Sequence, residues 1–214
     1  MSWAGRQALA GAGSWLDPAL ALANRIARRM VWLGGALILA AAITVSVDVS
    51  VRKLFSLSLG GADELSGYAF AIGVAWALPF TLLQRANIRI DALYAKLPAR
   101  AAAVLDLAAL LAMAVFVTVL TRYAWEVVSG SWGLNAHSNS QLNMPLWIPQ
   151  GIWFFGLMLF LLSVLLLTLR TALALAAGDL ARVRELAGAR GIEEESAEEA
   201  AYGLSLNRED SSRP

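Results

Sequence analysis

Four long apolar stretches constrain this sequence more than any other feature. They cover about residues 31–51, 64–83, 101–127 and 146–169, with few charged residues inside them. Crossing the hydrocarbon core of a bilayer, about 30 Å thick, takes roughly 20 residues of helix. A mean hydropathy of +0.61 with 15% charged residues is also unlike the composition of a water-soluble domain. The sequence therefore predicts an all-α integral membrane bundle of four transmembrane helices.

The Lys and Arg residues beside these stretches predict how the bundle is inserted. The link between the first and second stretches has only Arg52 and Lys53, and the link between the third and fourth has neither residue type. The other flanks are basic: Arg25, Arg28, Arg29, Arg85, Arg89, Lys96, Arg100, Arg170, Arg182 and Arg184. Because basic flanks remain in the cytoplasm, we expect both termini to be cytoplasmic.

Two shorter segments have the pattern of amphipathic helices that lie on the membrane surface. The first belongs to residues 1–30, where Asp17 and Pro18 predict a helix start and apolar residues then recur at helical spacing. The second covers about residues 88–98 and ends at Pro98. We expect two interfacial helices here. Residues 171–214 are rich in Glu, which predicts an acidic cytoplasmic tail that is partly disordered or forms a solvated helix.

Few side chains in this sequence could carry chemistry. It has no Cys, and its one histidine, His137, lies in a link rich in Ser and Asn. Zinc and haem sites need several nitrogen or sulfur ligands. The sequence has no phosphate-binding glycine loop and no nucleophile motif. We therefore predict no catalytic, cofactor-binding or metal site, no enzyme activity and no nucleic-acid partner.

The ionisable residues of the apolar stretches lie near the ends of those stretches. Asp48 precedes Arg52 by one helical turn, and Arg122 and Glu126 have the same spacing, which favours local ion pairs. Asp106 lies near the start of the third stretch. A proton or ion relay would need such a group near the middle of the bilayer. We interpret these residues as charged anchors or as contacts to a partner subunit.

Four short motifs have fixed places relative to the apolar stretches. Val47-Asp48-Val49-Ser50-Val51-Arg52 closes the first stretch, and Ala62-Asp63-Glu64-Leu65 opens the second. Asn87-Ile88-Arg89-Ile90-Asp91 follows the second, and Met144-Pro145-Leu146-Trp147-Ile148-Pro149-Gln150 opens the fourth. Over about residues 25–172 this arrangement resembles the small permease subunit of the TRAP (tripartite ATP-independent periplasmic) transporters, the DctQ-like family. Asn87 replaces the histidine that is usual in that family.

The resemblance implies a non-catalytic subunit of the bacterial inner membrane, in contact with membrane lipid. Its implied partners are a large TRAP permease and a periplasmic solute-binding protein. Uptake of an organic acid by sodium symport is then a property of the large permease. The candidate subunit-interface or anchoring residues are Asp48, Arg52, Glu64, Asn87, Arg89, Asp91, Pro145, Trp147 and Pro149.

Two other functions are compatible with four apolar stretches. A membrane anchor subunit of a respiratory oxidoreductase would need a haem or quinone site, which a single histidine does not favour. An autonomous small oligomeric transporter would need a polar or broken-helix site near the middle of the membrane, and the sequence offers none. We therefore expect these helices to hold a transporter in place and not to form its path.

Overall fold

The computed structural model describes residues 15–57, 60–86 and 97–188. Most of them belong to the long helices α2 (Leu16–Phe55), α3 (Ala62–Leu83), α5 (Ala99–Gly133) and α6 (Trp147–Ala177). Each of these four helices is long and apolar enough to cross a membrane. The described residues include no β-strand, so the predicted all-α class with four apolar helices is confirmed.

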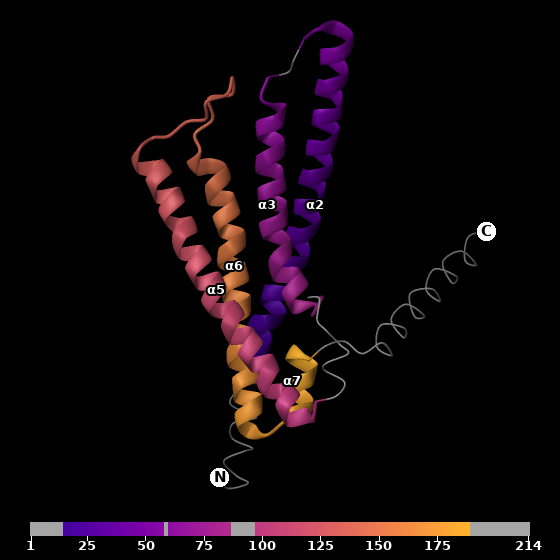
Figure 1. The fold of residues 1–214 in the computed structure, drawn as a ribbon, viewed down its shortest axis with the longest axis vertical. Helices are drawn as coiled ribbons and strands as arrows, with labels where there is room; N and C mark the ends of the chain where they lie inside the picture. The colour runs from indigo at the N-terminus through magenta and orange to yellow at the C-terminus, as the bar shows by residue number, and fades with distance from the viewer. Residues whose placement is uncertain (1–14, 58–59, 87–96, 189–214) are drawn as a thin grey trace, which may run out of the picture.

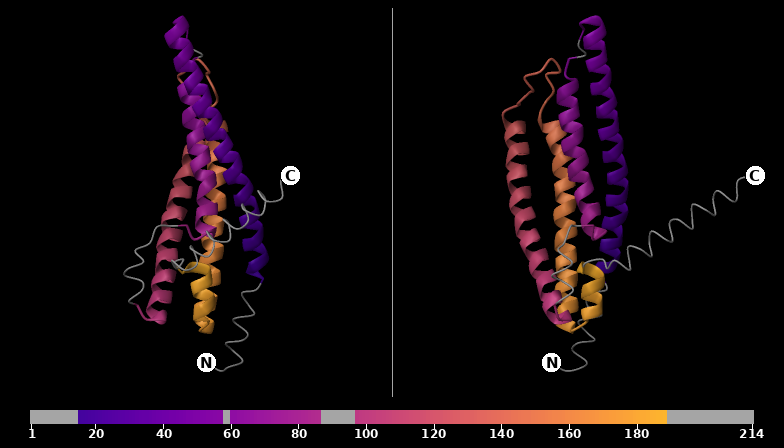
Figure 2. Two further views of the ribbon diagram at one scale, coloured as in Figure 1. Left: turned by 90° about the vertical axis from the view of Figure 1, so that its right-hand side faces the viewer. Right: turned by 45° about the vertical axis from the view of Figure 1, so that its right-hand side comes forward.

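The long helices stand side by side in a row (Figure 1). α2 packs on α3, α3 packs on α6, and α6 packs on α5. α2 also meets α6 near the lower end of Figure 1, where Asp17 contacts Arg170. Figure 2 shows that, turned by 90°, the row is narrow in its upper part and spreads in its lower part, where α5 and the start of α2 lie on opposite sides. The two edge helices, α2 and α5, therefore leave much of their surface uncovered by the rest of the chain.

The first predicted interfacial helix is not a separate element, and this corrects the prediction. Residues 16–55 form one continuous helix, because no proline or turn divides the amphipathic segment from the apolar stretch. One face stays buried across the predicted boundary, at Leu16, Ala23, Ala27, Met30 and Gly34. At 1.5 Å per residue the 40 residues of α2 span about 60 Å. Part of α2 must therefore lie beyond the hydrocarbon core.

The second predicted interfacial helix, about residues 88–98, lies almost wholly outside the described residues. The described residues also include a short amphipathic helix after α6, α7 (Leu180–Ala187), with Val183 and Ala187 buried. Gly178 ends α6 in the left-handed conformation, with φ 78°. The Asp179 side chain then accepts a hydrogen bond from the backbone N–H of Arg182 at 3.0 Å and caps α7.

The main core lies where α3, α5 and α6 meet. Its largest cluster contains Leu82, Leu110, Ala114, Val117, Phe160, Val164, Leu167 and Ala187. Elsewhere small residues allow two helices to approach closely, as is common in membranes. A Cβ on Gly34 of α2 would lie 3.1 Å from the Cα of Gly73 of α3. A Cβ on Gly156 of α6 would lie 3.0 Å from the backbone of Ala75.

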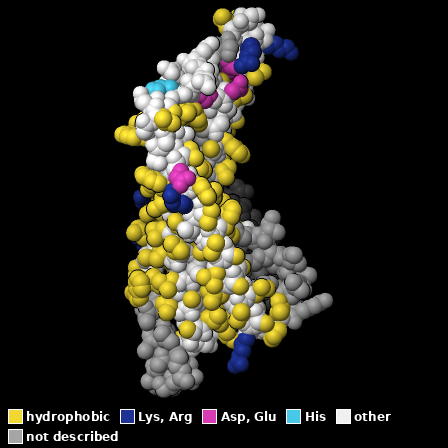
Figure 3. All heavy atoms as spheres, turned by 60° about the vertical axis from the view of Figure 1, so that its left-hand side comes forward, with side chains coloured by type: hydrophobic (Ala, Val, Ile, Leu, Met, Phe, Trp, Pro, Cys, Tyr) yellow, Lys and Arg dark blue, Asp and Glu magenta, His cyan; other side chains and the backbone are white. Residues whose placement is uncertain are grey.

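Hydrophobic side chains cover most of the face shown in Figure 3, and charged side chains occupy only a few places on it. In the most apolar part of α2 only 11% of the residues are buried, compared with 44% in α6. The exposed large side chains of α2 include Leu33, Leu37, Leu39, Ile43 and Val47. A surface of this kind suits contact with lipid or with another membrane protein.

Candidate functional site

Glu64, one of the candidate residues, lies in the first turn of α3 at the upper end of the row. We use "upper end" for the links 56–61 and 134–146, as they appear in Figure 1. The hydroxyl of Tyr68 donates a hydrogen bond to Glu64 Oε1 at 2.5 Å. The hydroxyls of Ser140 and Ser138, from the other link, lie near the same carboxylate, but its buried Oε2 forms no hydrogen bond with the described residues. Glu64 therefore places a carboxylate of α3 next to the link between α5 and α6.

The link 134–146 is folded around its two serines. The backbone N–H of Met144 donates to Ser138 Oγ at 3.1 Å, and the backbone N–H of Leu142 donates to Ser140 Oγ at 3.1 Å. The serines that hold the link in shape are thus the same ones that face Glu64. The two serines shape this link, and with Glu64 and Tyr68 of α3 they form one small polar cluster.

The two links at the upper end also touch directly. Gly60 and Gly61 have φ angles of 61° and 91°, which favour glycine because a Cβ is disfavoured there. The side chain of Gln141 lies against Gly60 and that of Leu142 against Gly61, so that a Cβ on either glycine would overlap its neighbour. The positive φ angles therefore favour glycine at both positions of the α2–α3 turn, and a Cβ at Gly61 would also displace Leu142.

The candidates Pro145, Trp147 and Pro149 form the beginning of α6. Trp147 packs edge-on against Trp132 at the end of α5, with ring centroids 4.6 Å apart. Pro149 is buried in the first turn of α6, where its missing N–H removes no helical hydrogen bond. Pro145 forms an isolated β-bridge with His137. These contacts lie within the chain and set the direction in which α6 leaves the link.

Asp48 and Arg52 form the predicted ion pair near the upper end of α2. The Asp48 side chain is 1% exposed, whereas that of Arg52 is 53% exposed. An unpaired buried carboxylate would be strongly unfavourable, so the ion pair with Arg52 reduces the cost of burying Asp48. Arg122 and Glu126 of α5 form the second predicted pair at 2.6 Å, but both are exposed, and exposed pairs contribute little to stability.

The lower end of the row, where α2 begins, α6 ends and α7 lies, holds an ion-pair network. Arg170 of α6 is 7% exposed, and its Nε and Nη2 donate to the two carboxylate oxygens of Asp17 at 2.9 and 3.3 Å. Arg182 of α7 contacts Asp17 at 3.5 Å and Glu185 at 2.7 Å. The side-chain hydrogen bond with Glu185 raises the pKa of Arg182 although its partial burial opposes this. The network joins three helices.

The sequence patterns did not predict the contact between Asp17 and Arg170. In the sequence, Asp17 indicates the start of a helix and Arg170 is one of the basic residues that indicate membrane orientation. The two residues are 153 positions apart. One signal was available: Arg170 is a lone charged residue at the end of a long apolar run. Because α6 continues to Ala177 and does not end near residue 169, Arg170 becomes buried and needs an acidic partner.

Between the two ends, the buried side chains of the described helices are apolar, small or hydroxyl-bearing. Ser163 and Thr168 are buried in α6, and each donates a hydrogen bond to a carbonyl of its own helix, at 2.8 and 2.7 Å. The buried charged side chains of the described residues are Asp48, Asp106 and Arg170, each toward an end of its helix. The same residues include no cluster of three or more His, Asp or Glu suited to a metal ion. The arrangement holds helices together and shows no charged path between them in the part described.

The sequence model of one protein family matches the chain. The family is described as tripartite ATP-independent periplasmic transporters, DctQ component, and the match covers residues 41–174, more than half of the 214 residues. The chain belongs to the DctQ family. No curated protein and no solved structure matches it. As a DctQ protein with four long apolar helices, it is a multi-pass membrane component of a tripartite transporter, a family of transporter components and not of enzymes.

The DctQ match covers the later part of α2, all of α3 and α5, and α6 as far as Ala174. Every candidate interface residue lies within it. Asn87, Arg89 and Asp91, however, lie outside the residues that the structure describes. Asp17 and the whole of α7 lie outside the match, so the lower network combines residues from inside and outside the DctQ region.

Proposed function

We propose that the chain is the small membrane subunit of a TRAP transporter and that it holds the large permease in place. In this proposal the large permease drives uptake of an organic acid with a sodium gradient. A periplasmic solute-binding protein captures that acid and delivers it. The DctQ match over residues 41–174 is the observation that carries the proposal. The position of the buried charges, toward the helix ends, supports a role beside the transport path.

The uncovered side of α2 is the surface that we assign to the large permease. The most apolar part of α2 is 11% buried within the chain, less than the 28% of α5 at the opposite edge. Ile43 and Leu39 are 56% and 63% exposed on α2. A long edge helix with large aliphatic side chains offers a continuous packing surface to a second membrane protein.

We propose that both ends of the chain lie in the cytoplasm and that the protein resides in the bacterial inner membrane. The start of α2 and helix α7 lie together at the lower end of the row, where Asp17 contacts Arg182. Arg25, Arg28 and Arg29 of α2 are close to the same end in sequence. Basic residues at that end support a cytoplasmic location.

The candidate residues divide into two groups under this proposal. Asp48, Arg52 and Glu64, with Pro145, Trp147 and Pro149, shape the upper end through the contacts described above and thereby set the surface offered to partners. Asn87, Arg89 and Asp91 are proposed as direct contacts to the large permease. We expect Arg89→Ala and Asp91→Ala to reduce assembly or transport while leaving membrane insertion intact.

Co-purification tests the proposal. The tagged chain would be expressed with each large TRAP permease of its source organism and purified in mild detergent, and one permease should co-purify at equal stoichiometry. Because the chain has no natural Cys, a single Cys introduced at Ile43 can be tested for cross-linking to that permease, with Val119→Cys on the opposite edge as the matched control. A monodisperse chain that retains no permease would overturn the proposal.

A further inference from the structure

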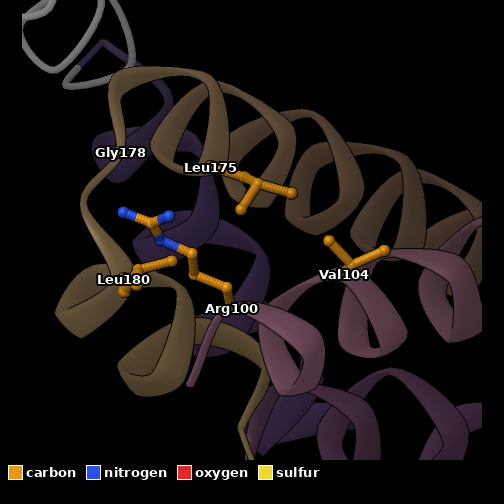
Figure 4. A pocket seen from close by; sticks show the side chains of 5 residues that line it. All are labelled: Arg100, Val104, Leu175, Gly178 and Leu180. Atoms are coloured by element: carbon orange, nitrogen blue, oxygen red, sulfur yellow. The ribbon is translucent and has the colours of Figure 1, made fainter. Parts of the chain in front are cut away.

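A small crevice lies at the lower end of the row, between α5, α6 and α7. It is lined by Arg100, Val104, Leu175, Gly178 and Leu180. Figure 4 shows Val104 and Leu175 on neighbouring helices, with the Arg100 side chain extending from α5 toward Gly178 and Leu180. The crevice therefore has an apolar wall on one side and a guanidinium group on the other.

Arg100 has no acidic partner within ion-pair distance among the described residues. Arg100 makes no ion pair and no hydrogen bond with any of them, and its side chain is exposed. The first turn of α5 contains no acidic residue, so Arg100 sits at the positive end of a helix dipole, which favours an anion and disfavours a cation. Asp179, the acid between Gly178 and Leu180, accepts a hydrogen bond from the backbone N–H of Arg182 and forms no ion pair with Arg100.

The position of the crevice along α5 and α6 sets a second requirement for the molecule that could occupy it. Val104 and Leu175 belong to the apolar helices α5 and α6, within one to two turns of their lower ends. An occupant must therefore carry a negative group near Arg100 and a hydrocarbon portion beside these two side chains. A basic pocket between helices at the cytoplasmic side of a membrane is the kind of site that binds anionic lipid head groups.

We propose that this crevice binds one anionic glycerophospholipid, with its phosphate against the Arg100 guanidinium and an acyl chain along Val104 and Leu175. Such a lipid would neutralise the first turn of α5 and fill the space between α5 and the α6–α7 turn. The proposal rests on the proposed cytoplasmic location of the lower end and does not depend on the identity of the transported solute. Three of the five lining residues lie beyond the DctQ match, which ends at residue 174.

Native mass spectrometry of the purified full-length chain tests this site. Delipidated protein would be titrated with dioleoyl phosphatidylglycerol and, separately, with dioleoyl phosphatidylcholine, which has the same acyl chains and a neutral head group. The chain should retain one phosphatidylglycerol molecule in preference to phosphatidylcholine. R100Q should weaken that binding about fivefold, the effect expected for one basic residue next to an anionic lipid.

Two further variants separate a site from general attraction to the surface. R184Q removes the same charge from α7 without touching the crevice, and it should leave phosphatidylglycerol binding unchanged. V104W fills the apolar wall at a position that is 57% exposed, so it should weaken binding as much as R100Q without disturbing the core. If V104W does not fold, Leu175→Trp places the same bulk from the facing wall. Equal retention of the two lipids, equal losses for R100Q and R184Q, or full binding by the tryptophan variant would overturn the proposal.

Discussion

At the scale of single residues, Arg170 is the clearest case of a charge that requires a specific partner. It is almost fully buried, and both carboxylate oxygens of Asp17 accept hydrogen bonds from it. A paired arrangement of this geometry makes burial of the guanidinium tolerable. The position of Asp17 in the first turn of α2 thus has a structural role that is separate from helix initiation.

Replacing Asp17 with Asn should destabilise the chain by about 1–3 kcal/mol, because Arg170 then lacks an ionised acceptor. The melting temperature in detergent measures this effect. Asp63→Asn, which removes an exposed acid from the first turn of α3, is the matched control and should change little. The exchanged pair D17R/R170D should recover part of the loss. A normal melting temperature for Asp17→Asn would show that the network does not matter for stability.

Glu64 and Tyr68 should control the order of the link 134–146. With Glu64→Gln or Tyr68→Phe, the backbone amides of Leu142 and Met144 should exchange with deuterium about 2- to 10-fold faster, the range expected for loss of one net hydrogen bond. Hydrogen exchange with mass spectrometry of the link peptide measures this. Glu126→Gln, an exposed acid on α5, should have no such effect. Unchanged exchange in both cluster variants would contradict the link's dependence on Glu64.

At the scale of helices, periodicity predicted which segments are helical and missed how far they extend. The four apolar helices could be predicted from the length of each apolar stretch alone. The continuity of α2 could not, because an amphipathic segment on the membrane surface and the first turns of a tilted span have the same pattern. What decides between them is the contact of Leu16 and Ala23 with the rest of the chain, which is not local information.

The contact between α2 and α3 should depend on Gly34 and not on Gly35. Gly34 lies against the backbone of Gly73, whereas no atom lies within 4 Å of a Cβ built on Gly35. Gly34→Leu should force the helices apart and cost about 1–3 kcal/mol, a typical penalty for overpacking. Gly35→Leu, the neighbouring control, should be neutral or slightly stabilising, since leucine favours a helix more than glycine does. Thermal unfolding of both variants compares them, and equal destabilisation would contradict this packing.

We expect the apolar face of α7 to hold this helix against α5 and α6. Val183 is fully buried against α5 and α6, while Ala181 on the same helix is exposed. Val183→Asp should therefore detach α7 and make it sensitive to protease, and Ala181→Asp should leave it protected. Limited proteolysis followed by mass spectrometry distinguishes the two. Protection of α7 in Val183→Asp would mean that other contacts, such as Arg182 with Asp17, are sufficient.

At the scale of the whole molecule, the chain is an open row of helices with its buried charges toward the ends. The sequence could predict the four helices and the family, because both depend on local pattern. It could not predict the order α2, α3, α6, α5 across the row, which depends on pairs such as Gly34 with Gly73. It also could not predict the polar cluster around Glu64, because Ser138 and Ser140 lie far along the chain from it.

An open row of helices leaves more helix surface for contact with lipid or another protein than a closed bundle does. Among the described long helices α2 is the least covered, with 11% of its most apolar part buried within the chain. This shape is consistent with a subunit that supports another protein along its length. The buried charged side chains of its described residues, Asp48, Asp106 and Arg170, each lie toward an end of a helix.

Transport by reconstituted vesicles tests the proposed division of labour between the subunits. Proteoliposomes would contain this chain alone, the co-purifying large permease alone, or both, with the solute-binding protein loaded with a labelled organic acid and an inward sodium gradient. We expect no uptake with this chain alone and the fastest uptake when both membrane subunits are present. Sodium-driven uptake by vesicles that contain only this chain would contradict the proposed supporting role.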